Sequence, residues 1–504
     1  MIFSRIGLIF LFLAIQVYVL AYAMMKLQSF IPHIAAARTV VVALVIIWLI
    51  NSKIDSSAKA TWLALFAFVP EFGAMFLIFL RLDIGHMNLK RQVADIISLA
   101  RRSISQDEEV FDCLREESPD AAALASYVAR TGDFPVYRNT GAVYFPLGDF
   151  AFLQMMEELK KAEHFIFIEF FIIGEGTMWG NVLQILAQKA KEGVDVRVMY
   201  DATCDLTLLP PDYPDRVRSL GIKCCKFDPL TPFLSTKYNF RDHRKIMVID
   251  GKTAFTGGIN LADEYINLLD RFGKWKDTAV LIRGQAVTSF TLMFLQMWRL
   301  YEPDTDFKPY LAASEDAGSP QGQGYVMPFF DSPLDDHRVG ERVLMDLLNR
   351  AKRYVYIMTP YLLLGDEIQG AVRFAAERGV DVRIIMPGIP DKKIVYDIGR
   401  TYFPHLIDAG VKMYLYDPGF MHAKVWLSDD TDAFVGTINM DYRSFNHHFE
   451  CGVYMYRTEC LKDILKDFQE TMKECTLLTM ESARKGNIIK KAVGAAGRMI
   501  APLL

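Results

Sequence analysis

Two copies of one short motif hold the residues whose types and spacing suit chemistry at a phosphate. Each copy has a histidine, a lysine two residues later and an aspartate five residues beyond the lysine: His243, Lys245 and Asp250, then His422, Lys424 and Asp429. Side chains alternate along a strand, so histidine and lysine would share one face while the aspartate would point the other way. Imidazole can attack phosphorus or transfer a proton, and lysine can neutralise phosphoryl oxygens. We therefore expect the histidines and lysines to contact substrate and the aspartates to serve structure or electrostatics.

The presence of two histidines makes the pattern a catalytic prediction. One histidine can form a phosphohistidine while the other protonates the departing alcohol and then deprotonates the incoming one. Each motif is followed by Gly-x-x-Asn, and the amides of Asn260 and Asn439 can donate further hydrogen bonds to phosphoryl oxygens. This chemistry needs no metal. Because the chain shows no dedicated metal-ligand cluster, we expect no metal and no other cofactor.

The motifs belong to an internal repeat of strands and amphipathic helices. Aromatic and β-branched runs at 165–169 and 354–358 resemble each other, and so do the strands at 194–198 and 380–384. Each of the latter two follows a helix that ends at a glycine. Strand–helix alternation predicts an α/β fold of two pseudo-symmetric halves with mainly parallel sheets, packed around one active site.

The first 82 residues are apolar enough to predict a transmembrane anchor. Three hydrophobic runs cover 6–25, 35–50 and 60–80. The first and third are long enough to cross a hydrocarbon core of about 30 Å, whereas the second is short, so two or three spans stay open. No small-residue cleavage site follows the first run, which favours an anchor over a signal peptide. Basic residues after the third run predict a multi-pass protein of the cell membrane whose catalytic body faces the cytoplasm.

Composition changes divide the rest of the chain. We expect a connector at 83–130, a first half at 131–312, a linker rich in Gly, Ser, Pro and Gln at 313–324, and a second half at 325–482. The tail, 483–504, has basic residues among apolar ones, which suits a helix at an anionic bilayer surface or one packed on the body.

Net charge and cysteine use narrow the class of protein. The 504 residues carry a formal net charge of −4, whereas a general nucleic-acid binder is usually basic. The seven cysteines show no zinc or redox spacing, which favours reduced thiols and a cytoplasmic body.

At the level of these motifs the chain resembles the phospholipase D superfamily, and its details resemble the bacterial cardiolipin synthase branch. Two departures are Asp242, where the family more often has asparagine, and the pair His447–His448, where it tends to have less basic residues. The segments that carry the resemblance are 239–245 (NFRDHRK), 257–265 (GGINLADEY), 359–361 (TPY), 436–450 (GTINMDYRSFNHHFE) and 501–504 (APLL).

The resemblance implies that two phosphatidylglycerol molecules are joined into cardiolipin with release of glycerol. It implies His243 as the nucleophile and His422 as the general acid and base. It also implies a carboxylate from each half that orients a histidine, for which Asp277 and Glu450 are the positional candidates. Expected partners are phosphatidylglycerol, other anionic phospholipids and the bilayer, with no nucleic acid; a homo-oligomer stays open.

Other functions remain compatible with the same motifs. A membrane-bound phospholipase D would give free phosphatidic acid. A phosphatidylserine synthase of the superfamily would need a nucleotide-activated lipid and serine. A nuclease is disfavoured by the apolar runs and the acidic balance, and a non-catalytic membrane scaffold is disfavoured by two intact motifs.

Overall fold

The computed structural model describes most of the chain from residue 34 onward. The described residues are 18, 22, 34–52, 54, 56–68, 73, 77, 84–132, 134–138, 140–227, 240–315, 322–335, 337–485 and 488–501. The first apolar run, 6–25, therefore lies outside them except for Tyr18 and Tyr22. Residues 316–321 of the predicted linker, and residues 69–72, 74–76 and 78–80 of the third apolar run, lie outside them too.

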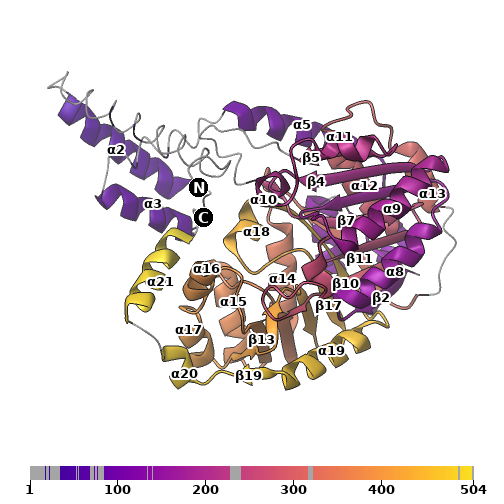
Figure 1. Cartoon of the computed structure of the whole chain (residues 1–504). Coiled ribbons are helices and arrows are strands. Elements are labelled where there is room, and N and C mark those ends of the chain that lie inside the picture. The colour runs from indigo at the N-terminus through magenta and orange to yellow at the C-terminus, as the bar shows by residue number, and fades with distance from the viewer. Residues whose placement is uncertain are drawn as a thin grey trace.

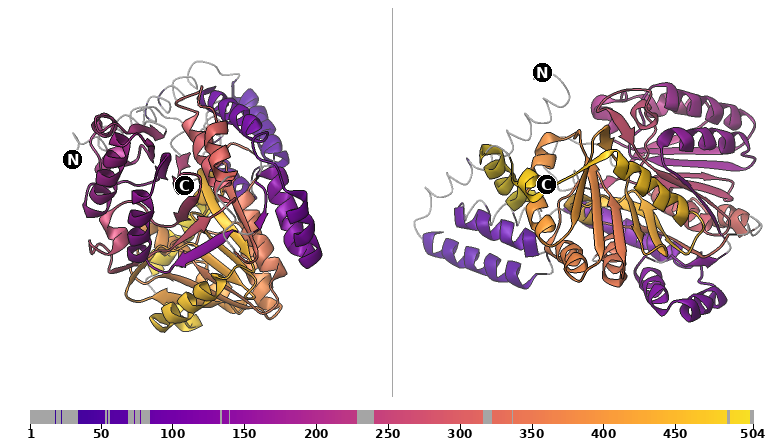
Figure 2. Two further views of the ribbon diagram at one scale, coloured as in Figure 1. Left: turned by 90° about the vertical axis from the view of Figure 1, so that its right-hand side faces the viewer. Right: turned by 90° about the horizontal axis from the view of Figure 1, so that it is seen from below.

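Two sheets form the body, one for each half of the repeat (Figures 1 and 2). The first sheet has seven strands. In spatial order these are β2 (Gly141–Phe145), β10 (Ala279–Arg283), β8 (Thr253–Gly257), β7 (Lys245–Ile249), β3 (Phe165–Phe170), β4 (Asp195–Asp201) and β5 (Lys223–Phe227).

The second sheet has the same core arrangement with extra strands at its edges. Its spatial order is β1 (Tyr137–Arg138), β11 (Tyr325–Asp331), β18 (His448–Tyr456), β17 (Asp432–Gly436), β16 (Val425–Ser428), β12 (Tyr354–Met358), β13 (Asp381–Pro387), β14 (Lys412–Tyr416) and β19 (Cys475–Leu477). Strand β6 (Arg241–Asp242) pairs with β18, and β9 (Lys274–Lys276) pairs with β15 (Gly419–Met421). Strands β1 and β6 come from the first half of the chain, so the first half contributes two strands to the second sheet.

The repeat strands are confirmed, but the prediction of mainly parallel sheets is wrong. Apart from the short pair β6–β18, only the described neighbours β3–β4–β5 and β12–β13–β14 pair in parallel within the two sheets. The other sheet neighbours are antiparallel, because β7–β8 and β16–β17 are hairpins rather than strand–helix–strand units. Both hairpin turns hold consecutive residues at positive φ, with Asp250 and Gly251 at 52° and 64° in the first. Such turns join antiparallel strands directly.

One helix, α12 (Val287–Trp298), lies between the two sheets. It contacts β3, β7 and β8 of the first sheet and β11 of the second. All of its residues except Thr288 are buried, as expected for a helix that is apolar around most of its circumference. The apolar core of the second sheet therefore continues through α12 to the inner face of the first sheet.

The remaining body helices cover the outer faces and ends of the sheets. In the first half they are α8 (Gly148–Lys160), α9 (Thr177–Lys191), α10 (Cys204–Thr207), α11 (Tyr213–Arg218), η2 (Asp263–Ile266) and α13 (Lys308–Glu315). In the second half they are α14 (Val339–Arg350), α15 (Asp366–Glu377), α16 (Lys393–Gly399), α17 (Phe403–Asp408), α18 (Tyr442–Asn446), α19 (Leu461–Lys473) and α20 (Met480–Arg484).

Helices α2 (Ile34–Asn51) and α3 (Ser56–Phe68) project from one end of the body (Figure 1). They pack together through Leu49, Trp62 and Phe66. None of the helices within the described ranges combines the length and the apolarity needed to cross a membrane. The prediction of two or three spans is therefore unsupported by the described residues, although α2 covers most of the second run.

The segment predicted as a connector contains three helices, α5 (Ile84–Ala100), α6 (Glu108–Glu117) and α7 (Pro119–Thr131). Their apolar residues join the large core, so this segment is packed on the body. The tail forms α21 (Ile488–Ile500), which lies against α16 and α3. Within it, Arg498 donates to Gln369 Oε1 over 3.0 Å and lies 4.2 Å from the ring centroid of Tyr402.

Candidate active site

Two short parallel ladders between the halves bring the histidines to the interface. In the first, β6 pairs with the start of β18, and the backbone N–H of His243 then donates to Phe449 O over 2.9 Å. In the second, β15 pairs with β9, and the N–H of His422 donates to Lys276 O over 2.8 Å. Each histidine thus follows directly after a strand that is paired with the opposite half.

These ladders place each histidine beside a carboxylate of the other half. His243 Nδ1 lies 3.0 and 2.9 Å from the two oxygens of Glu450. His422 Nδ1 lies 2.6 Å from Asp277 Oδ2. A carboxylate on Nδ1 keeps the proton there and leaves Nε2 with its lone pair. The arrangement is reciprocal, because each half supplies one histidine and also the carboxylate that holds the histidine of the other half.

The two carboxylates are themselves held firmly. Thr437 Oγ1 donates to Glu450 Oε2, and the N–H of Thr278 donates to Asp277 Oδ1 over 2.8 Å. Gly258 lies so close to Asp277 that a methyl group in its place would collide with Oδ1. Burial raises the pKa of Glu450 well above its usual value, although nearby Lys245 opposes the shift.

Both motif lysines are buried against their own histidines. Lys245 Nζ donates to the carbonyl oxygen of His243, and Lys424 Nζ donates to that of His422. Lys424 Nζ also lies 3.0 and 3.1 Å from the two ring nitrogens of His422. Burial lowers the pKa of Lys245 to about 8 and that of Lys424 to about 7. A substrate phosphate would favour the charged form of both lysines.

The histidines share one electrostatic environment. Burial lowers the pKa of His243 well below its usual value, and the charges of Lys245, His448, Lys424 and His422 add to the shift. Burial, followed by Lys424, lowers the pKa of His422 to about 4, while Asp277 opposes the shift. At neutral pH both imidazoles are therefore uncharged before substrate binds, as a nucleophile must be.

The motif aspartates lie at the far end of the hairpin strands. Asp250 accepts hydrogen bonds from the backbone N–H groups of Glu163, His164 and Phe165 at 2.7–2.8 Å. Asp429 accepts the corresponding bonds from residues 352–354 at 2.6–2.9 Å. Each aspartate ties the hairpin turn to the start of the neighbouring strand, β3 or β12, and its oxygens face backbone rather than the histidines.

The two asparagines differ in their surroundings. Asn260 Oδ1 accepts from the N–H of Ile172 over 2.9 Å, and Asn260 Nδ2 donates to Tyr265 OH over 2.8 Å. Asn439 Oδ1 is buried and has no hydrogen-bond partner in the described structure. Asn260 therefore braces the loop before α9, with one amide hydrogen left over, whereas the amide of Asn439 is less constrained.

Two side chains near the site, Arg244 and His448, were given no role from the sequence. Arg244, between the motif histidine and lysine, is fully buried and binds both Glu169 and Asp242, which holds this segment against β3. His448 was noted only as a departure from the family, yet its ring centroid lies 5.2 Å from that of His243. The parallel pairing of β6 with β18 is what brings these histidines together, and no sequence pattern predicts it.

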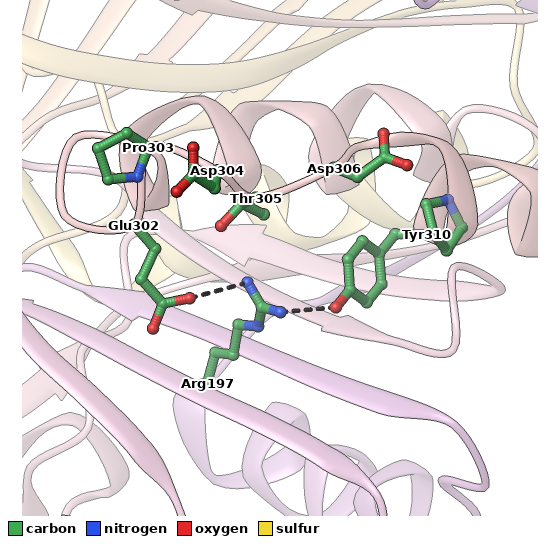
Figure 3. A pocket seen from close by; sticks show the side chains of 8 residues that line it. Arg197, Glu302, Pro303, Asp304, Thr305, Asp306 and Tyr310 are labelled. Carbon is green, nitrogen blue, oxygen red and sulfur yellow. Dashed lines mark hydrogen bonds and ion pairs between the residues drawn. The ribbon is translucent and has the colours of Figure 1, made fainter.

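A separate pocket contains none of the motif residues (Figure 3). Its floor is Arg197, near the amino end of β4, which donates to Tyr310 OH over 2.6 Å and lies 3.8 Å from Glu302 Oε2. Arg197 is also paired with Asp195 at 2.8 Å. These contacts fasten α13 and the preceding loop to the first sheet, so the pocket has a structural explanation.

Comparison with known proteins agrees with the two-half geometry. The family model described as "Cardiolipin synthase, PLD-like domain" matches residues 155–298 and 344–472, which together exceed half of the chain. A cardiolipin synthase of Geobacillus kaustophilus is 32% identical over 486 residues, covering 95% of each chain. Cardiolipin synthase 2 of Bacillus anthracis is 32% identical over 450 residues, covering 89% of this chain and 87% of the relative.

Two further similarities extend the picture. An uncharacterised protein of Streptococcus mutans is 51% identical over 459 residues, covering 91% of this chain and 99% of the relative. Among solved structures, a phosphatidylserine synthase of Haemophilus influenzae matches with a TM-score of 0.57 and 15% identity, covering 72% of this chain and 93% of the other. At 15% identity, the match to the phosphatidylserine synthase shows a shared fold alone.

Proposed function

The chain belongs to the family of PLD-like cardiolipin synthases, and we propose that it joins two phosphatidylglycerol molecules into cardiolipin and releases glycerol. The observation that carries the mechanism is the reciprocal pairing of His243 with Glu450 and of His422 with Asp277 across the halves. It provides two imidazoles with Nδ1 held by a carboxylate, one for attack and one for proton transfer.

In the first step, His243 Nε2 attacks the phosphorus of one phosphatidylglycerol. The bond from phosphorus to the glycerol headgroup oxygen breaks as the nitrogen–phosphorus bond forms, and His422 gives its proton to the leaving glycerol oxygen. Glu450 stabilises the positive charge that His243 acquires. His422 has to be protonated for this step, and the negative substrate phosphate favours that form although its pKa in the free site is about 4.

In the second step, a primary hydroxyl of the second phosphatidylglycerol attacks the phosphohistidine. His422, now neutral, takes the hydroxyl proton, and the nitrogen–phosphorus bond breaks to release His243 unchanged. Lys245 and Lys424 neutralise the charge on the phosphoryl oxygens in both steps, and Asn439 has an amide available for the same oxygens. Water at the same position would give phosphatidic acid, so a lipid acceptor must be favoured by its local concentration.

The membrane supplies that concentration, and we place the projecting helices in it. Helix α2 exposes Val40, Leu44, Ile47 and Ile50, each at 55–60% of its surface. Exposed apolar side chains along one helix are unfavourable in water and suit a lipid environment. The proposal of a cell-membrane protein with a cytoplasmic body, and of α21 near an anionic surface, rests on this surface and on the apolar sequence of residues 1–82.

Product analysis tests the function. Purified full-length protein is given phosphatidylglycerol labelled in both the phosphatidyl and the headgroup glycerol, in mixed micelles without added metal. We expect cardiolipin and free glycerol in equal amounts, no product from His243→Ala or His422→Ala, and normal product from His405→Ala, an exposed histidine on α17. Phosphatidic acid as the main product would replace the transferase with a hydrolase.

Trapping distinguishes the two histidines. When His422→Ala is mixed with a phosphatidyl-labelled substrate whose leaving group departs without a proton, such as phosphatidyl-p-nitrophenol, and quenched in alkali, label should stay on the protein as phosphohistidine. His422 is then not needed to form the intermediate but is still needed to resolve it. His243→Ala should retain none. The reverse pattern would exchange the roles of the two residues.

A further inference from the structure

A third histidine lies beside the nucleophile and faces the same carboxylate. His448 Nδ1 is 3.4 Å from Glu450 Oε1, while His243 Nδ1 is 2.9 Å from Glu450 Oε2. The two imidazole rings are tilted by 36° with centroids 5.2 Å apart. Three side chains of metal-ligating type are therefore gathered at one point, and their ligand atoms all lie within 4.8 Å of one another.

His448 is not used by the mechanism, and its Nδ1 has no hydrogen-bond partner among the described residues. Only 10% of its side chain is exposed, and the nitrogen is buried and aimed at Glu450. A buried polar atom without a partner costs about 1–3 kcal/mol, so its retention calls for a physical explanation. A bound cation would supply the missing partner.

We propose that His243, His448 and Glu450 bind a divalent transition-metal ion of the zinc class, and that this ion inhibits the enzyme. Two imidazoles and one carboxylate form a ligand set that zinc uses with one open position. Ligand atoms about 2 Å from a tetrahedral ion lie about 3.3 Å apart, close to the two histidine–glutamate distances. A small rotation of the rings closes the gap between the imidazoles.

The metal would act on the nucleophile through its tautomer. When Nδ1 of His243 binds the ion, the single proton of the neutral ring must sit on Nε2. The lone pair that attacks phosphorus is then absent, and Glu450 is occupied as well. Inhibition is reversible, because removal of the ion returns the proton to Nδ1 and restores the bond to Glu450.

Two positive groups limit the affinity. Lys245 lies close enough to Glu450 to affect its ionisation, so it repels a divalent ion in its charged form. Arg443 Nε donates to His448 Nε2 over 3.4 Å, and metal binding at Nδ1 would place a proton on Nε2 and end that contact. At 3.4 Å the contact is near the limit of a hydrogen bond, so its loss costs little. The site therefore suits a regulatory ion that exchanges.

The test compares two adjacent histidines. His448→Asn removes one ligand, whereas His447→Asn is its matched control, since the ring of His447 lies toward Phe240, 6.3 Å between centroids. Zn²⁺ is titrated in a metal buffer against cardiolipin formation by the full-length protein, and each variant is referred to its own metal-free rate. We expect wild type and His447→Asn to be inhibited alike, and His448→Asn to need at least about tenfold more Zn²⁺, which is a loss of about 1.4 kcal/mol.

A second experiment measures metal binding without turnover. It separates the two proposals, because inhibition by the metal rests on the proposed function whereas metal binding does not. Co²⁺ is added to the detergent-solubilised protein without lipid, and the visible absorption of low-coordinate Co²⁺ is recorded. Wild type and His447→Asn should show the band, Zn²⁺ should abolish it, and His448→Asn and Glu450→Gln should lack it. Equal Zn²⁺ sensitivity of His448→Asn and wild type, or a Co²⁺ band that survives in His448→Asn, would overturn the proposal.

Discussion

Lys276 of β9 and Asp467 of α19 form an ion pair of 2.7 Å between the two halves. Lys276 directly precedes Asp277, the carboxylate that holds His422. Only 4% and 8% of the Lys276 and Asp467 side chains are exposed. Tyr144 OH donates to the same aspartate over 2.6 Å. Because the N–H groups of His422 and Ala423 both donate to Lys276 O, the pair anchors the backbone of the active site.

Breaking this pair should destabilise the protein strongly. Lys276→Met leaves Asp467 buried without its cation, and such a change costs about 3–5 kcal/mol. The double variant Lys276→Met/Asp467→Leu should recover much of that loss, because no uncompensated charge remains. The midpoint of denaturant-induced unfolding in detergent measures the loss of stability in the single variant and its recovery in the double variant.

Lys473→Met is the control for that comparison, since Lys473 is paired with Glu470 at the surface and should change the midpoint little. If the single and double variants of the buried pair were equally unstable, lost packing rather than a stranded charge would be the cause.

Gly258 should tolerate no side chain. A methyl group there would collide with Asp277 Oδ1 and lie 3.0 Å from the carbonyl oxygen of His422, so Gly258→Ala displaces the carboxylate from its histidine. We expect a fall in kcat of about 100-fold or more, the usual contribution of a positioned proton donor, with a smaller change in KM.

Gly180 on α9 provides the matched alanine substitution. Apart from the backbone of α9 itself, no described residue lies within 4 Å of the methyl group that Gly180→Ala would add, and alanine favours a helix more than glycine does. That variant should keep full activity with equal or higher stability. Full activity in Gly258→Ala would show that Asp277 does not need its present position.

The motif aspartates should matter for stability rather than for the chemical step. Asp250→Ala leaves three backbone N–H groups without their acceptor, which costs about 1–3 kcal/mol, and alanine also resists the positive φ of this turn. Asp250→Asn keeps an acceptor and tolerates that φ, so it should cost less.

Both variants are assayed well below their melting temperature, where the folded fraction should turn over at a rate near that of wild type. A large loss of kcat in Asp250→Asn with an unchanged melting temperature would instead assign this aspartate to the chemistry.

The buried lysines should set the alkaline limit of activity. Their pKa values in the free site are lowered to about 8 and about 7, so both lose their proton as pH rises through that window. In the proposed mechanism the charged forms neutralise the phosphoryl oxygens. Because kcat/KM reports the free enzyme, kcat/KM should fall between about pH 7 and 8.

Lys424→Arg tests the assignment, since a guanidinium stays charged across this range. Whatever the absolute rate of Lys424→Arg, the alkaline fall of kcat/KM that is due to Lys424 should move to higher pH in this variant. An alkaline limb that stays unchanged would exclude Lys424 as its source.

Local sequence patterns determined much of this protein. The spacing His-x-Lys-x4-Asp predicts the reactive side chains, and the runs at 165–169 and 354–358 are strands as expected. These features depend on neighbours within a few residues, where side-chain alternation and turn chemistry decide the outcome. The parallel direction predicted for the sheets is wrong because strand–helix alternation outweighed a local hairpin signal, Asp250–Gly251, between β7 and β8.

Only the tertiary structure decided which groups meet at the site. Glu450 is 207 residues from His243, and Asp277 is 145 residues from His422, so no local pattern could assign each carboxylate to its histidine. This reciprocal pairing follows from two parallel ladders between the halves, and the β6–β18 ladder also brings His448 beside His243. Sequence determines what a side chain can do, whereas the pairing of distant strands determines which charges and protons it encounters.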